Sequence, residues 1–109
     1  RHVLRAIAEG APPRWRSWNW VDARPGSWHD LDPHRPLVVE GCGAVSPVAR
    51  ALADHAIWIE LPDDERRRRA IARDGDAFAR NWQRWARQEE WHSRLHDPHG
   101  TADEVVTPD

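Results

Sequence analysis

Residues 36–74 constrain the fold of this chain most, because they read as a strand, a helix, a second strand and an arginine-rich helix. Residues 37–39 are Leu-Val-Val and residues 56–61 are Ala-Ile-Trp-Ile-Glu-Leu. Short apolar runs of this kind are typical of strands that a parallel sheet buries on both faces. Between them, Ser46 and Pro47 favour a helix start, since a hydroxyl caps the helix and proline fits its first position. This order predicts a parallel crossover and an α/β fold.

The segments on either side of this region carry their own patterns. Apolar residues at helical spacing predict a helix over residues 3–8 that ends at Gly10. Pro25 and Gly26 predict a turn. Residues 77–95 predict the longest helix, and residues 102–106 a last strand.

Composition limits the class of protein. A chain of 109 residues supports a single domain, residues 1–109, with few strands in its sheet. The net charge of −2 argues against a general nucleic-acid binder, and no apolar stretch approaches the roughly 18 residues of a membrane span. Cys42 has no second cysteine to pair with, which fits a cytoplasmic setting. The chain has no methionine, so we expect it to be a fragment.

Glu40 follows the first apolar run and precedes Gly41. If residues 37–39 form a strand, Glu40 lies at its carboxyl end, the edge at which parallel sheets bind ligands. A carboxylate there suits Mg²⁺, which keeps several waters and needs few protein oxygens. The alternative is an acid that caps the following turn.

Five arginines follow the second apolar run. At 100° per residue, Arg66, Arg69 and Arg73 share one face of the predicted helix, and three guanidiniums on one face suit phosphate oxygens. The alternative is a solvated face paired with the acids around it, the usual fate of a charge run.

Tryptophans and arginines concentrate in residues 14–28. Trp18 and Trp20 alternate with polar residues, as in a short strand or an extended active-site loop. These indoles suit stacking on a planar base, and Asn19 between them suits hydrogen bonding to a base or ribose. The alternative is a packing patch.

Two histidines, His92 and His96, stand one helical turn apart. This spacing forms half of a zinc site, but the chain has no HExxH pattern and Cys42 is distant. A zinc site is therefore a third interpretation.

Several segments taken in order resemble the uridine kinase-like branch of P-loop nucleoside and nucleotide kinases. The resemblance covers nearly the whole chain. Its parts are Trp15-Arg-Ser-Trp-Asn-Trp20, Pro36-Leu-Val-Val-Glu-Gly-Cys-Gly43, Trp58-Ile-Glu60 with the arginines up to Gly75, the helix from Trp82 to Glu90, and Ala102-Asp-Glu-Val-Val106.

The resemblance implies a three-layer α/β/α fold of P-loop NTPase type with a short parallel sheet, and an ATP-dependent phosphotransferase acting on a nucleoside or similar hydroxyl acceptor. Residues 63–76 would be its lid. Arg66, Arg69 and Arg73 would contact ATP, with Arg69 and Arg73 catalytic, and Glu40 would help to bind Mg²⁺.

For the acceptor, the resemblance implies Trp18, Asn19 and Trp20. Trp18 and Asn19 replace the family's usual tyrosine and aspartate, which leaves the identity of the acceptor open. The family's first half, with its glycine-rich phosphate loop and lysine, has no counterpart here, since all 16 Lys+Arg residues are arginine. We therefore expect the chain to be inactive alone.

A rival interpretation is a non-catalytic nucleotide- or protein-binding module, or pseudo-kinase, that acts through the Trp/Arg surface. An upstream reading frame that encodes a glycine-rich loop favours the kinase, and a start codon just before Arg1 favours the rival.

Overall fold

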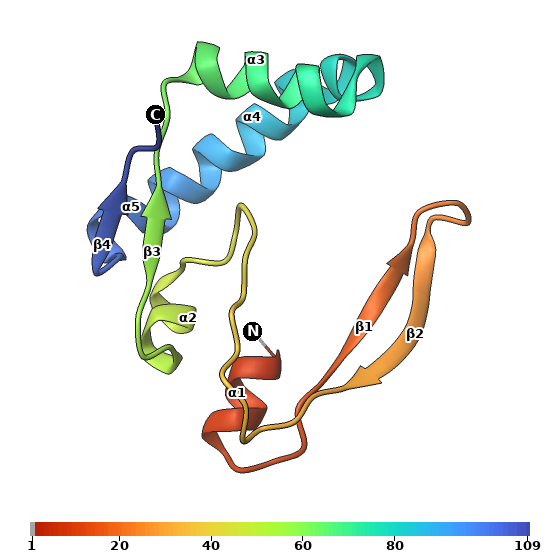
Figure 1. Cartoon of the computed structure of the whole chain (residues 1–109), viewed down its shortest axis with the longest axis vertical. Coiled ribbons are helices and arrows are strands. Elements are labelled where there is room, and N and C mark those ends of the chain that lie inside the picture. Colours follow the sequence, from red (N-terminus) through yellow and green to blue (C-terminus); the bar gives the residue numbers. More distant parts are fainter. Residues whose placement is uncertain (1) are drawn as a thin grey trace.

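The computed structural model describes residues 2–109, without the side chain of Ala77, and combines helices with short strands (Figure 1). In chain order the elements are α1 (His2–Ala8), β1 (Arg14–Asn19), β2 (Arg24–Asp30), α2 (Pro47–Leu52), β3 (Ile57–Ile59), α3 (Asp63–Asp74), α4 (Asp76–His96), α5 (Pro98–Thr101) and β4 (Glu104–Val106).

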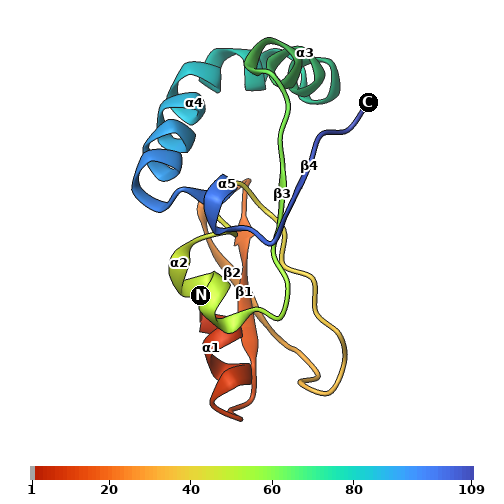
Figure 2. The same cartoon turned by 90° about the vertical axis from the view of Figure 1, so that its left-hand side faces the viewer.

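The strands form two separate pairs. β1 and β2 make an antiparallel hairpin, whereas β3 and β4 pair in parallel, with Trp58 opposite Val105. The chain leaves β3, passes through α3, α4 and α5, and returns as β4 (Figures 1 and 2). A parallel pair joined through helices confirms the α/β class, although the crossover is not the predicted one.

The first predicted strand is wrong. Residues 36–40 form no strand, so Glu40 lies in a loop and not at the end of a strand. Val38 is 88% exposed. An apolar run becomes a strand only when a neighbour pairs with its backbone, and no strand pairs with residues 37–39 in the part of the chain that the structure describes. β3 and β4 were both predicted, but each is shorter than expected.

The helix boundaries follow local chemistry. α1 ends before Gly10, whose φ of 70° lies in the left-handed region that glycine adopts freely. The Ser46 hydroxyl accepts a 3.3 Å hydrogen bond from the Ala49 amide, and Pro47 is the first residue of α2. The predicted end of α1 and the predicted start of α2 are both confirmed.

α3 and α4 are separated by Gly75, with φ of 73°. α4 carries an aromatic face, since the Phe78 ring lies 5.8 Å from that of Trp82 and 4.4 Å from that of Trp85. α4 ends at His96, and the next residue, Asp97, has a left-handed φ of 40° and accepts a hydrogen bond from the Gly100 amide at the start of α5.

The predicted turn at Pro25 and Gly26 is wrong, because both residues belong to β2. The hairpin turns at residues 20–23, where Asn19 Oδ1 accepts hydrogen bonds from the amides of Val21 and Asp22. A Cβ atom at Gly26 would lie 2.6 Å from Ser17 Oγ, so glycine is needed there for space.

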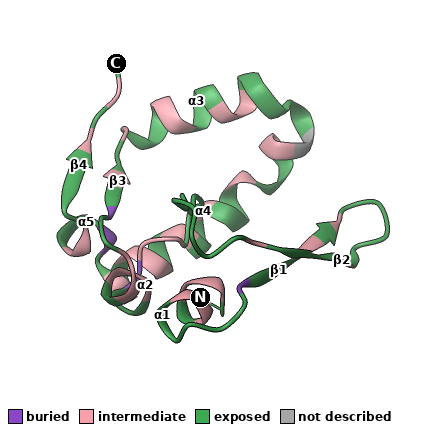
Figure 3. Cartoon of the chain, turned by 60° about the horizontal axis from the view of Figure 1, so that its bottom comes forward, coloured by how far each residue is buried: buried purple, intermediate pink, exposed green. Residues whose placement is uncertain are grey.

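The molecule has a very small core. Of the residues whose burial is described, only Pro13, Ser46, Ala56 and Pro98 are buried (Figure 3). The radius of gyration is 15.8 Å, whereas about 13 Å is typical of a compact domain of this length. The elements therefore form an open frame with much apolar surface in solvent.

Candidate functional site

Arg66 joins α3 to α4. Its guanidinium donates to Asp63 at 2.6 Å and to Glu89 of α4 at 2.5 Å, and its side chain is 30% exposed. Burial alone would lower the pKa of Arg66, but the hydrogen bonds to Asp63 and Glu89 outweigh it and raise the pKa. The structure thus gives Arg66 a packing role that its position in an arginine run does not reveal.

Arg69 is held within its own helix and by the end of the chain. Its Nε donates to Glu65 at 2.5 Å, and its Nη2 donates to the Asp109 carbonyl at 2.9 Å. Hydrogen bonds from Arg68 and then Arg69 lower the pKa of Glu65. Arg69 remains 43% exposed, so part of its guanidinium faces solvent.

Arg73, near the C-terminal end of α3, has the most exposed side chain of the three predicted arginines, at 75%. It pairs with Asp74 at 2.7 Å, and this hydrogen bond and charge raise the pKa of Arg73. The charge of Glu40 raises it further. The effect of Glu40 is the smallest of these causes, and the described structure shows neither a hydrogen bond nor an ion pair between Glu40 and Arg73.

The three predicted arginines do not act on one common partner. Arg66 bonds to Glu89 of α4, and Arg69 bonds to the last residue of the chain. Arg73 pairs with Asp74, and the charge of Glu40 has a smaller effect on its pKa. Because the strongest contacts of each guanidinium are with carboxylates or a carbonyl, an incoming anion has to compete with them. Arg73 is the best placed to bind an anion, since both of its carboxylate hydrogen bonds in the described structure go to Asp74 at the surface.

A metal site needs several donor side chains in one place. Within residues 2–109, no group of three or more His, Cys, Asp or Glu side chains is placed to hold a metal ion. Glu40 is an exposed carboxylate outside any such cluster. His92, part of the suggested zinc half-site, donates instead to the Val45 carbonyl at 3.0 Å, and its ring lies 4.9 Å from that of His96.

The hairpin carries the predicted acceptor residues at its far end. Trp20 is 85% exposed, and the ring of Trp18 meets it edge to face at 6.5 Å. The Asn19 amide is used within the turn, because it also donates to Asp22 at 3.0 Å. β1 packs on α1, and Figure 1 shows the hairpin extending away from the other elements.

Further along the hairpin, aromatic rings already have cationic and aromatic neighbours. The guanidinium carbons of Arg14 and Arg16 lie 4.9 Å and 5.8 Å from the ring centre of Trp28. Trp15 stacks on His29 at 4.6 Å. The hairpin therefore presents an aromatic and cationic surface, as the alternating sequence predicts.

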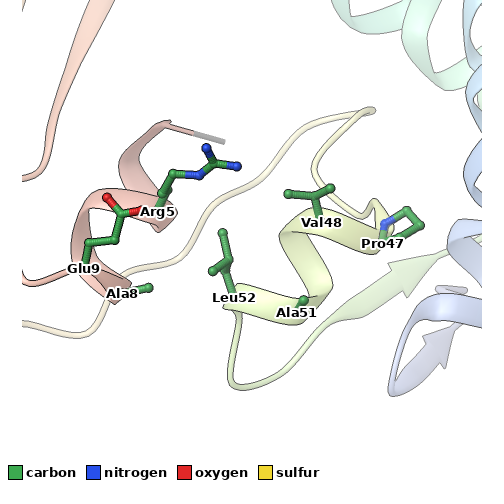
Figure 4. Close-up of a pocket in the computed structure, with 7 residues that line it drawn as sticks. All are labelled: Arg5, Ala8, Glu9, Pro47, Val48, Ala51 and Leu52. Atoms are coloured by element: carbon green, nitrogen blue, oxygen red, sulfur yellow. The ribbon is translucent and has the colours of Figure 1, made fainter.

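One pocket was not predicted. An open pocket of about 430 Å³ lies between α1 and α2, with Val48 and Leu52 on one side and Ala8 on the other (Figure 4). Arg5 and Glu9 are the charged residues of its lining. The apolar spacing of residues 3–8 shows that α1 has a contact face, but not that α2 meets it.

No family model matches this chain, and no curated protein matches it. In the described part of the chain, none of the helices is both long enough and apolar enough to cross a membrane.

Proposed function

We propose that this chain supplies the lid and the acidic side of an ATP-dependent phosphotransferase of the uridine kinase type, acting on a nucleoside or similar hydroxyl acceptor. The observation that carries the proposal is the arginine run of α3, in which the Arg73 side chain is 75% exposed and hydrogen-bonds to the neighbouring Asp74 at the surface. An exposed guanidinium, together with an acid such as Glu40, supplies two of the groups that hold a metal-bound triphosphate. We also propose that the enzyme has the three-layer α/β/α architecture of P-loop NTPases and acts in the cytoplasm.

In this proposal each residue has a distinct task. Glu40 offers a free carboxylate for Mg²⁺, directly or through water. Bound Mg²⁺ supplies charge neutralisation at the phosphates. Arg73 contacts the phosphate oxygens and stabilises charge that develops during transfer, and Arg69 assists from the adjacent turn. Arg66 keeps α3 against α4, which fixes where the other two guanidiniums stand.

The proposal also requires a part that these residues do not contain. A P-loop enzyme cradles the β- and γ-phosphates with a glycine-rich loop and a lysine, and the 109 residues include no lysine. We therefore propose that catalysis needs a further polypeptide segment that carries this loop.

The test measures transfer of labelled phosphate from ATP to a panel of nucleosides by the protein expressed from its complete reading frame. Arg73→Ala should lower turnover at least tenfold with an unchanged fold. Arg67→Ala, an exposed arginine on the same helix, is the matched control and should retain turnover. Equal turnover in both variants, or none in the unaltered protein with any nucleoside, would contradict the proposal.

A second candidate, a non-catalytic binding module, is favoured by the exposed indoles of the hairpin. Titration of the chain with ATP and Mg²⁺, followed by tryptophan fluorescence, separates the two. Tight binding without the missing loop, and loss of that binding in Trp20→Ala, would support the module.

A further inference from the structure

β3 is paired along one edge only. In the described chain it belongs to a two-stranded sheet with β4. The Ala56 carbonyl accepts from the Glu104 amide, and the Glu60 amide donates to the Val106 carbonyl. Because successive peptide groups of a strand point to opposite edges, the backbone groups of Ile57 and Ile59 face away from β4.

The surroundings of this free edge are apolar. Ile57 is 49% exposed and Ile59 is 63% exposed, and alternation places both on one face of the strand. In Figure 1, residues 36–41 rise beside β3 on the side away from β4, and Figure 2 shows the same upward direction for both segments. Val38, within that segment, is 88% exposed.

Two segments with strand-like composition thus run in one direction, and neither pairs with the other. A lone two-stranded parallel sheet with open faces is unusual, since parallel sheets are normally covered. An open edge is a template for another strand. The small core and large radius of gyration of the chain also indicate that apolar surface is left without a packing partner.

The position of residues 36–41 limits what can occupy the edge. In a second copy of this chain β3 is paired with β4, so pairing β3 with β3 would bring the second β4 toward the place of residues 36–41 (Figure 1). A single extended segment brings no such neighbour. It would meet β3 on one side and residues 37–39 on the other.

We propose that the free edge of β3 accepts one added polypeptide strand, uncharged, apolar on both faces and parallel to β3, and that residues 37–39 pair with its other edge. The added strand gives partners to the backbone groups of Ile57 and Ile59. It also explains why residues 37–39 have the composition of a buried strand while lying in solvent. The proposal depends on the sheet alone and stands whether or not the chain transfers phosphate.

The test adds a synthetic peptide to the isotope-labelled chain and follows amide hydrogen exchange by NMR. The peptide carries six valine and isoleucine residues between soluble Gly-Ser ends, and the control peptide has proline at its centre. With the first peptide, the amides of Ile57 and Ile59 should exchange at least tenfold more slowly. The amide of Val38 should also exchange more slowly. A spin label at the peptide's C-terminus should broaden the signal of Glu60 more than that of His55 if the strand is parallel.

Matched variants complete the test. Ile59→Lys should remove the protection, since the edge strand then carries a charge. Val21→Lys, at a residue 94% exposed on the hairpin, should leave it intact. Circular dichroism of both variants checks the fold. No protection at saturating peptide, equal protection by the proline peptide, or protection that rises with protein concentration alone would each overturn the proposal, the last by identifying a second copy as the occupant.

Discussion

The carboxylate of Asp103 accepts a 2.7 Å hydrogen bond from the backbone amide of Ala56, the buried residue directly before β3. Its other oxygen accepts from Arg50 of α2 at 2.5 Å. One side chain therefore ties the start of β3 to the start of β4 and to α2. The Ala56 amide is the largest cause that lowers the pKa of Asp103, and Arg50 lowers it further.

Replacing this carboxylate should loosen the parallel sheet. Asp103→Ala leaves the buried amide of Ala56 without its partner, which destabilises the fold. We expect a lower urea midpoint and faster exchange of the β3 amides. Asp54→Ala, at an exposed residue of the same loop region, is the control and should leave the midpoint unchanged. Equal urea midpoints in the two variants would show that Asp103 does not stabilise the sheet.

The same carboxylate predicts how stability depends on pH. Its folded-state pKa lies below the ordinary value of 3.8. The stability it contributes is therefore fully present above about pH 3.8 and is lost as the pH falls through the lower, folded-state pKa. Urea midpoints measured from pH 7 down to pH 2.5 should fall less steeply in Asp103→Asn than in the unaltered chain. Parallel curves would refute the assignment.

The Arg66–Glu89 pair should hold α3 on α4. Arg66→Ala leaves Glu89, whose side chain is 23% exposed, without its cation, and should cost about 1–2 kcal/mol of unfolding free energy. Arg67→Ala on the same helix should change it by less than about 0.5 kcal/mol. Thermal unfolding followed by circular dichroism measures both. A cost for Arg67→Ala as large as that for Arg66→Ala would argue against a specific clamp.

Gly26 offers a test of close packing in the hairpin. Gly26→Ala places a Cβ atom 2.6 Å from Ser17 Oγ, so the strands have to separate locally. Hydrogen exchange of the β1 and β2 amides should quicken. The double variant Gly26→Ala with Ser17→Gly removes the contact and should recover part of the protection. Failure of the second change to restore any protection would point to another cause.

Asn19 separates a turn-forming role from a role in acceptor binding. Its Oδ1 accepts hydrogen bonds from two backbone amides of the turn. Asn19→Asp keeps that acceptor and should preserve the hairpin, whereas Asn19→Ala should weaken it. Indole chemical shifts of Trp18 and Trp20 report on the outcome. Similar shifts in both variants would show that the turn does not need this side chain.

Local chemistry made several elements predictable. The Ser46 cap with Pro47, and Gly75 between two helical patterns, act through neighbouring residues, so their helix boundaries can be found from the sequence. Residues 37–39 show the limit of this approach. Their composition suits a strand, but a strand needs a paired neighbour, and pairing is a property of the whole sheet.

The candidate site divides in the same way. The exposure of Trp20 and the arginine run of α3 follow from the sequence pattern. The capture of Arg66 by Glu89 depends on how α3 folds back over α4, which no spacing within α3 encodes. The role of Asn19 in acceptor binding stays a prediction, and the hydrogen bonds of its side chain within the turn after β1 could not be read from the sequence.

α3 is attached to α4 at two points, through the chain at Gly75 and through the Arg66–Glu89 ion pair. The glycine is the pivot between the two helices, and the ion pair lies more than two helical turns away along α3. An anion that draws Arg66 from Glu89 would break the ion pair without touching the pivot, and Arg73, next to the pivot, would move less than the start of the helix.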